Sequence, residues 1–117
     1  MREKIFANED HKNNYKKLMK HIDKGCHESE RIQAMVYLLA LFETIKPGFS
    51  KTVFDFKNLL IKPNVLEESW QTSSTRRTIL LAFNLFNDYP ATIQEIFGYS
   101  YWDEFYLEAI RIRYPHC

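Results

Sequence analysis

The side chains with the greatest capacity for chemistry are those of cysteine and histidine. Cys26 and His27 are adjacent, and His116 and Cys117 are adjacent as well. Thiolate and imidazole are ligands that zinc prefers, so two such pairs could complete a tetrahedral site. Structural zinc sites, however, usually take two cysteines or two histidines that lie a few residues apart, and neither pair has that form. We therefore predict a solvated turn and a loose tail, with no metal site and no cofactor.

The candidate catalytic residues, His11 and Cys26, lack the partner groups that catalysis would need. His11 falls on the apolar arc of the first predicted helix with Tyr15 and Leu18, which is typical of a core histidine with hydrogen-bonded ring nitrogens. Cys26 precedes a helix start beside His27, but no third partner or oxyanion loop can be identified. Gly-rich phosphate loops and the common hydrolase motifs are missing. We predict a protein without catalysis, and a small metal-dependent or cysteine enzyme is the second alternative, after nucleic-acid binding.

Lysines gather on one face of the first predicted helix. Lys12, Lys16 and Lys20 recur every fourth residue and therefore share that face. Residues 1–27 carry seven basic and four acidic side chains, whereas residues 28–117 carry nine and eleven. A basic stripe can follow a phosphate backbone, although it is also the ordinary solvated face of an amphipathic helix. Nucleic-acid binding through this face is the runner-up hypothesis.

The segment 92–114 resembles a helix-turn-helix at first sight, because a short helix, Gly98 and a longer helix follow one another. The longer helix begins with Asp103 and Glu104, where a reading helix needs side chains that contact bases. Carboxylates at that place repel phosphates. We therefore do not expect DNA recognition by this segment.

A polar cluster with an aromatic residue precedes the third long helix. Its members are Trp70, Gln71, Thr72, Ser73, Arg76 and Arg77. Trp70 offers apolar area, the helix N-terminus offers free N–H groups to an acidic group, and the arginines offer bidentate contacts. The alternative is that the hydroxyl groups cap the helix and Trp70 packs beneath it. Together with the lysines of the first helix, this cluster is the surface that we expect a partner to contact.

Hydrophobic periodicity predicts an all-α protein. The first helix begins at Asn8 and stops at Gly25, and the second, over about 28–43, is apolar nearly all round. Residues 49–71 are predicted to be irregular with short helices, and a pair of strands is the alternative. A third long helix opens within 72–75 and ends at 88–90.

Two more helices complete the predicted fold, a short one over 92–97 and a last one over 101–113. In the last helix Glu104, Glu108 and Arg111 share a face that we expect to point to solvent. The helices that are apolar all round should be central. The fold class that follows is a compact bundle of about five helices, two of them buried, in a single helical domain over residues 1–117.

Composition limits the class of protein. A chain of 117 residues that is 45% hydrophobic, with 3 glycines and 4 prolines, is long enough to bury a core. The formal charge of +1 argues against a strongly basic nucleic-acid coat and an acidic DNA mimic. The longest apolar run, 34–42, is far shorter than the roughly 20 residues that cross a bilayer, and no signal peptide is visible. We expect a cytoplasmic protein with no membrane partner, and we leave homo-oligomerisation open.

Four stretches together resemble a small uncharacterised family of proteins from Firmicutes and their phages and prophages. They read FANEDHKNNY at 6–15, WQTSS at 70–74, LAFNLFN at 81–87 and EAIRIRY at 108–114. The resemblance implies a small helical domain in a bacterial or phage cytosol, and it transfers no activity. Small phage and prophage proteins often bind and disable a host protein, including defence nucleases. The leading hypothesis is therefore a non-catalytic protein-binding module that modulates or inhibits a host protein.

Overall fold

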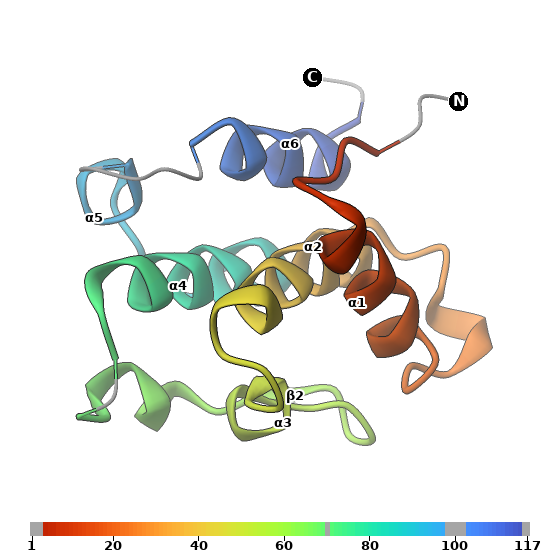
Figure 1. The fold of residues 1–117 in the computed structure, drawn as a ribbon, viewed down its shortest axis with the longest axis horizontal. Coiled ribbons are helices and arrows are strands. Elements are labelled where there is room, and N and C mark those ends of the chain that lie inside the picture. The colour runs from red at the N-terminus through yellow and green to blue at the C-terminus, as the bar shows by residue number, and fades with distance from the viewer. Residues whose placement is uncertain (1–3, 70, 98–102, 116–117) are drawn as a thin grey trace.

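Two helices, α2 (Glu30–Ile45) and α4 (Ser73–Asn87), form the centre of the molecule. The computed structural model describes residues 4–69, 71–97 and 103–115. Every residue from Ala34 to Phe42 in α2 is fully buried, as are Ile79, Ala82 and Phe83 in α4. The two helices pack more extensively on each other than any other pair (Figure 1). Their largely apolar circumference confirms the prediction of two buried central helices, and α4 keeps a half-buried strip that includes Arg77 and Asn84.

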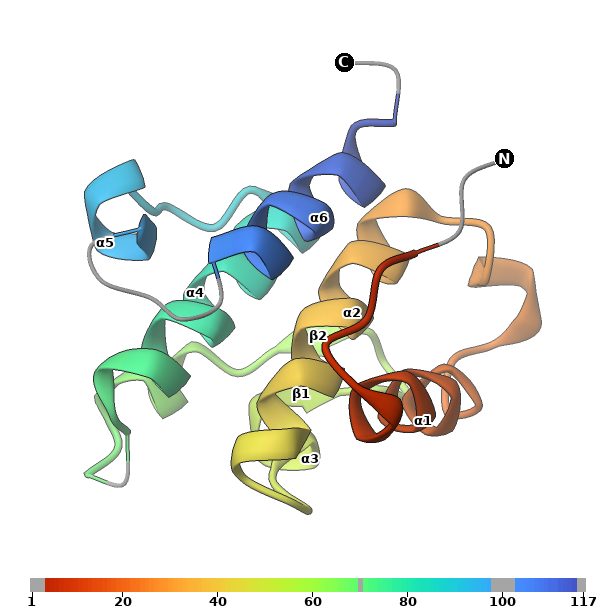
Figure 2. The same ribbon diagram turned by 45° about the horizontal axis from the view of Figure 1, so that its top comes forward.

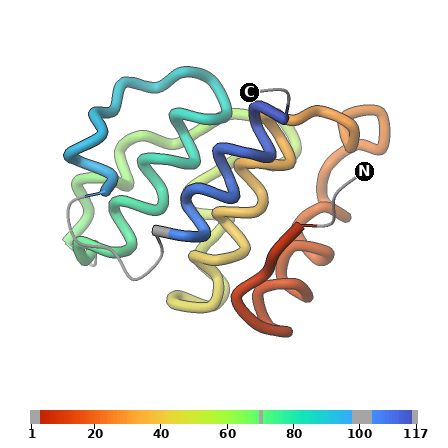
Figure 3. The backbone as a smooth tube through the Cα atoms, turned by 90° about the horizontal axis from the view of Figure 1, so that it is seen from above, coloured from red at the N-terminus to blue at the C-terminus, as the bar shows by residue number. Residues whose placement is uncertain are grey.

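The other long helices cover this pair. α1 (Glu9–Met19) and α6 (Asp103–Arg113) both pack on α2, and the short α5 (Ile93–Phe97) packs on α4. Figures 2 and 3 show α6 lying across α2 and α4 on the same side as the N-terminal segment. The all-α fold class is confirmed for the described part of the chain. No helix found there is long and apolar enough to cross a membrane.

Residues 50–67 form a layer on the opposite side of α2 and α4 from α6 (Figure 1). Its elements are α3 (Ser50–Val53), β1 (Phe54–Asp55), β2 (Leu60–Ile61) and the 3₁₀ helix η2 (Pro63–Glu67). The strands are antiparallel, with Phe54 opposite Ile61. The predicted short helices are present, and the strand pair that was the alternative occurs between them. η2 starts at a proline because proline's fixed φ suits the first helical position.

The first helix is shorter than predicted. Asn8 caps it as expected, since its side chain accepts the N–H of His11 at 2.9 Å. The prediction that it runs to Gly25 is wrong, because the helix ends at Met19 and a 3₁₀ helix, η1 (Lys24–Cys26), follows after a turn. Asp23 caps η1 by accepting the N–H of Gly25, which starts a separate element there. α2 likewise starts two residues later than predicted, after the cap Ser29.

His11 is a core histidine, as predicted. It is fully buried, and its Nδ1 accepts the N–H of Ala7 at 3.0 Å. That contact leaves the proton on Nε2, which donates to the carbonyl oxygen of Tyr37 at 2.9 Å. Burial lowers the pKa of His11, and this effect exceeds that of the hydrogen bond to Tyr37, which raises it. Both ring nitrogens are therefore engaged in holding the N-terminal segment on α2.

The prediction that Glu108 faces solvent is wrong. Its side chain is 2% exposed, and it accepts hydrogen bonds from the N–H of Ile5 at 3.0 Å and from Arg111 at 3.2 Å. The hydroxyl of Tyr37 donates to the carbonyl oxygen of Ile5, so the main chain of that residue is held on both sides. Helical spacing alone cannot show this burial, because the N-terminal segment that covers Glu108 comes from the other end of the chain.

Candidate partner-binding groove

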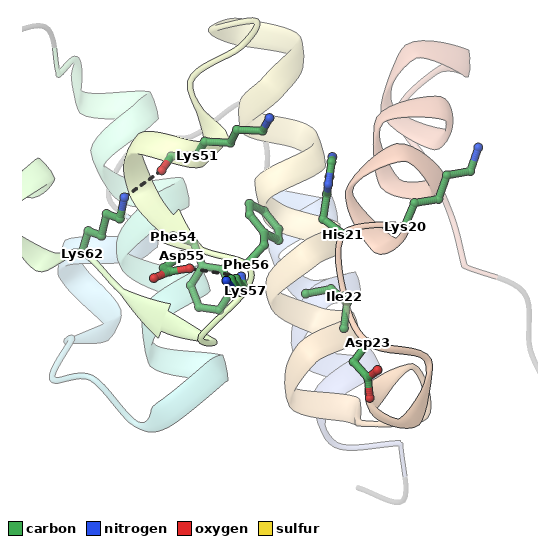
Figure 4. Close-up of a pocket in the computed structure, with 10 residues that line it drawn as sticks. All are labelled: Lys20, His21, Ile22, Asp23, Lys51, Phe54, Asp55, Phe56, Lys57 and Lys62. Atoms are coloured by element: carbon green, nitrogen blue, oxygen red, sulfur yellow. Dashed lines mark hydrogen bonds between the residues drawn. The ribbon is translucent and has the colours of Figure 1, made fainter.

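A groove opens on the surface between two segments that are far apart in the sequence. One side is the connection between α1 and η1 (Figure 4). The other is residues 51–62, the β1–β2 pair with its flanking segments, which we call the hairpin. Its volume is about 710 Å³, which lies in the range of clefts that take small ligands or short chain segments. Its lining residues are Lys20, His21, Ile22, Asp23, Lys51, Phe54, Asp55, Phe56, Lys57 and Lys62.

Local hydrogen bonds fix the hairpin side of the groove. The carboxylate of Asp55 accepts the main-chain N–H groups of Lys57 and Asn58, each at 3.1 Å, and the side-chain amide of Asn58 at 2.8 Å. This arrangement is an Asx turn, which an aspartate forms readily after a strand. The Nζ of Lys62 donates to the carbonyl oxygen of Lys51 at 3.1 Å and ties the two ends of the hairpin together.

The floor of the groove is apolar and closed. Phe54, Phe56 and Ile22 are 1%, 8% and 3% exposed. The rings of Phe54 and Phe56 meet edge to face with centroids 5.2 Å apart, a favourable aromatic arrangement. The ring of His21 lies 6.0 Å from that of Phe56 and so joins the two sides. A ligand would therefore meet the rim of the groove and not enter the core.

The rim is positively charged. Lys20, Lys51, Lys57 and Lys62 are all exposed. Within the described part of the chain, the first three of these lysines make no ion pair. The pKa of the Asp55 carboxyl group is lowered, mainly because the side-chain amide of Asn58 donates a hydrogen bond to it. The positive charge of Lys62 lowers it by a smaller amount. Ammonium groups of this kind attract carboxylates and phosphates.

The structure brings one member of the predicted lysine face to the groove. Lys12, Lys16 and Lys20 are all exposed. Of the three, Lys20 is the one that lines the groove, and Figure 4 shows its side chain pointing away from the hairpin. The lysine face of α1 therefore leads up to the groove and does not fill it.

The start of α4 lies on the other side of the molecule from α1 (Figure 1). Thr72 accepts the N–H of Thr75 at 3.2 Å in a capping box. Gln71 donates to the carbonyl oxygen of Val65 at 2.8 Å and accepts the hydroxyl of Thr75 at 2.6 Å. The side chains of Gln71 and Thr72 thus form hydrogen bonds that stabilise the N-terminus of α4.

The rest of the predicted polar cluster keeps some access to solvent. Ser73 is exposed, and Arg76 and Arg77 are half-buried. Trp70 lies outside the described residues. The contact surface predicted around the start of α4 therefore stays a prediction.

Of the two cysteine–histidine pairs, Cys26 and His27 lie within the described residues. Cys26 is a half-buried free thiol, and the Nε2 of His27 donates to the carbonyl oxygen of Ile22 at 2.9 Å. His116 and Cys117 lie outside the described residues. Across the ranges 4–69, 71–97 and 103–115, no group of three or more histidine, cysteine, aspartate or glutamate side chains is arranged to hold a metal ion.

Sequence reasoning did not single out the lysines of the hairpin. Lys51, Lys57 and Lys62 are separated by apolar residues in a segment without helical periodicity. The signal that could have grouped them is the pair Asp55 and Asn58, whose spacing favours a tight turn. Such a turn folds the segment back and brings the lysines to one surface.

The chain can now be placed among known proteins. A search of curated proteins gives no match, and a search of solved structures gives none either. A family model described as "Family of unknown function (DUF6075)" matches residues 1–117. This match confirms the expectation that the chain belongs to a family without an assigned function. The chain belongs over its whole length to DUF6075, a family of unknown function.

Proposed function

We propose that this protein is a non-catalytic binding module and that its partner is another protein. The observation that carries the proposal is the groove beside the hairpin, where exposed lysines surround a closed apolar floor. Charged rims of this kind steer an oppositely charged partner and set the orientation in which it docks. A ligand that contacts the rim need not be chemically changed by it.

The class of partner is proposed from the resemblance to proteins of Firmicutes and their phages. We propose a host protein of the bacterial cell, including a defence protein, that is modulated or inhibited when this module binds. What supports this part of the proposal is the analogy with small phage proteins that bind host proteins.

The test compares two faces of the same protein. A tagged protein is used to recover partners from a bacterial lysate, and the partners are identified by mass spectrometry. One variant reverses Lys51 and Lys57 to glutamate, a second reverses Arg76 and Arg77, and Lys17→Glu serves as a control on the exposed surface of α1. Circular dichroism and thermal melting verify that each variant is folded.

We expect the groove variant to lose a partner that the wild type and the Lys17→Glu control both retain. Loss of the partner only in the Arg76 and Arg77 variant would place the contact at the start of α4 instead. Retention of every partner by the groove variant would contradict the proposed role of the groove.

Nucleic-acid binding is the second candidate function, and one observation favours it. The exposed Lys12 and Lys16 extend the basic rim along α1 beyond Lys20. A gel shift with DNA and RNA, repeated at rising salt, tests it because each phosphate contact steepens the salt dependence of binding. Binding that Lys12→Glu and Lys16→Glu abolish would favour this candidate over the protein partner.

A further inference from the structure

We propose that the groove takes an extended, acidic segment of a protein, held by the lysines of its rim; this inference rests on the function proposed above. The segment would lie between the hairpin and the connection after α1. Its carboxylates would meet the ammonium groups of Lys51, Lys57 and Lys62 on the hairpin side. Lys20, whose side chain points away from the hairpin, would add positive charge beside the groove.

The charges of the lining favour carboxylates as the ligand groups. The lining contains four lysines and two aspartates. Asp55 is engaged by three hydrogen bonds from its own turn, and Asp23 accepts the N–H of Gly25. Both carboxylates are thus partly satisfied within the chain, whereas Lys20, Lys51 and Lys57 make no ion pair among the described residues. The charge left for a ligand is positive.

The closed floor argues against a single-stranded nucleic acid. Proteins that bind single strands stack bases on exposed aromatic faces. The aromatic rings of Phe54 and Phe56 are turned into the core, with 1% and 8% of their residues' surface exposed. Among the lining residues this leaves the imidazole of His21 as an exposed ring.

The mixed lining also suits a peptide better than a phosphate chain. A peptide backbone offers N–H donors as well as carbonyl acceptors, so Asp23 and Asp55 can accept from it while the lysines donate to its carboxylates. The sugar-phosphate backbone of DNA offers acceptors alone, and the two aspartates would repel it. A volume of about 710 Å³ holds a short segment and not a folded domain.

Fluorescence anisotropy with defined probes tests the inference. The probe is a short labelled peptide of alternating glutamate and glycine. A matched peptide with glutamine in place of glutamate and a labelled oligothymidine of similar length serve as comparisons. Each probe is titrated with the wild type, with Lys51→Glu/Lys57→Glu and with the control Lys17→Glu, at low and at raised salt.

We expect the glutamate peptide to bind the wild type, and its affinity to fall as salt rises, because exposed charge pairs are screened. The groove variant should bind it about tenfold more weakly or worse, since two rim charges are reversed. The glutamine peptide should bind the wild type no more tightly than it binds the groove variant. The control should stay within about twofold of the wild type.

Three results would overturn the inference. Equal binding of the glutamate peptide by the wild type and the groove variant would show that the peptide is held elsewhere. Tighter binding of the oligothymidine, lost in the groove variant, would make the ligand a nucleic acid. If no peptide binds but the groove variant still loses its partner in the recovery experiment, the proposed function stands and the chemistry assigned to the segment is wrong.

Discussion

The imidazole ring of His11 contacts Tyr37 at two places, its main-chain carbonyl group and its aromatic ring. The Nε2 of His11 donates to the carbonyl oxygen of Tyr37 at 2.9 Å, and the ring centroids lie 4.6 Å apart in an edge-on arrangement. Because Nδ1 accepts the N–H of Ala7, a second ring proton would face another donor. Tyr15, which packs on the same Phe6 ring, has its pKa raised to about 12 by burial, so it stays neutral and offers no compensating charge.

This geometry predicts that acid destabilises the protein through His11. Its pKa is lowered in the folded state from the ordinary value of 6.5, so the unfolded chain takes up a proton that the folded chain resists. The free energy of unfolding should be level above about pH 6.5 and should fall below it, by at most about 2 kcal/mol at about pH 5. Urea denaturation across this pH range measures the fall.

His11→Gln is the control for that experiment, since glutamine does not titrate and carries both a donor and an acceptor. The difference between wild type and variant removes the contributions of the other histidines. Parallel pH curves for the two proteins would show that His11 titrates in the folded state as it does in the unfolded chain.

Glu108 should contribute substantially to stability. Its buried carboxylate accepts the N–H of Ile5 and pairs with Arg111. Glu108→Ala should lower the free energy of unfolding by about 1.5–3 kcal/mol, because a hydrogen bond to a charged group is lost and a donor is left unsatisfied. Hydrogen exchange at the amide of Ile5 should accelerate in the same variant.

Glu104→Ala is the matched control for Glu108, on the same helix but exposed. It should change stability by no more than about 0.5 kcal/mol. Equal effects of the two substitutions, or unchanged exchange at Ile5, would mean that the N-terminal segment is not held by Glu108 in solution.

The two central helices supply a third prediction. Leu38 in α2 and Phe83 in α4 are fully buried. Leu38→Ala and Phe83→Ala should each cost about 2–5 kcal/mol, because each leaves a cavity in the centre of the core. Leu107→Ala, on a side chain that is 52% exposed, should cost far less. Chemical denaturation measures all three, and a cost below about 0.5 kcal/mol at both core sites would contradict the burial of Leu38 and Phe83.

Local sequence signals predict the presence of the main helices, although not the end of the first one, which stops at Met19. The continuous apolar run from Ala34 to Phe42 has no polar face, so its central place follows from the sequence alone. The sequence predicts Asn8 as a cap because an asparagine side chain can accept a free N–H at the start of a helix, and Asn8 accepts that of His11. The place of His11 followed from helical spacing.

Long-range contacts could not be derived in the same way. Glu108 has the spacing of a surface residue, and its burial depends on Ile5, which is 103 residues away in the sequence. The groove has the same origin, because Lys20 and the hairpin lysines come from separate elements. No periodicity within either segment reveals which other segment packs beside it.

The turn at Cys26 and His27 gives a prediction about metals. The Nε2 of His27 carries a proton that it donates to the carbonyl oxygen of Ile22, so that nitrogen is not free to bind a metal. A chelator should therefore leave the melting temperature unchanged. Stoichiometric zinc in protein purified without added metal would contradict this prediction, and thermal melting with and without chelator would then show whether the metal supports the fold.

The cap at Thr72 gives the last prediction. Its side chain accepts the N–H of Thr75, and the hydroxyl of Thr75 bonds in turn to Gln71. Thr72→Ala should lower the free energy of unfolding by about 1 kcal/mol, whereas Thr72→Ser should keep the cap and most of the stability. Ser73→Ala, one residue further on at an exposed position, is the control and should have little effect. Chemical denaturation of the three variants measures what the cap contributes to stability, and the recovery experiment measures partner contact. A Thr72→Ser variant that is as stable as the wild type but no longer recovers its partner would show that Thr72 also belongs to a contact surface.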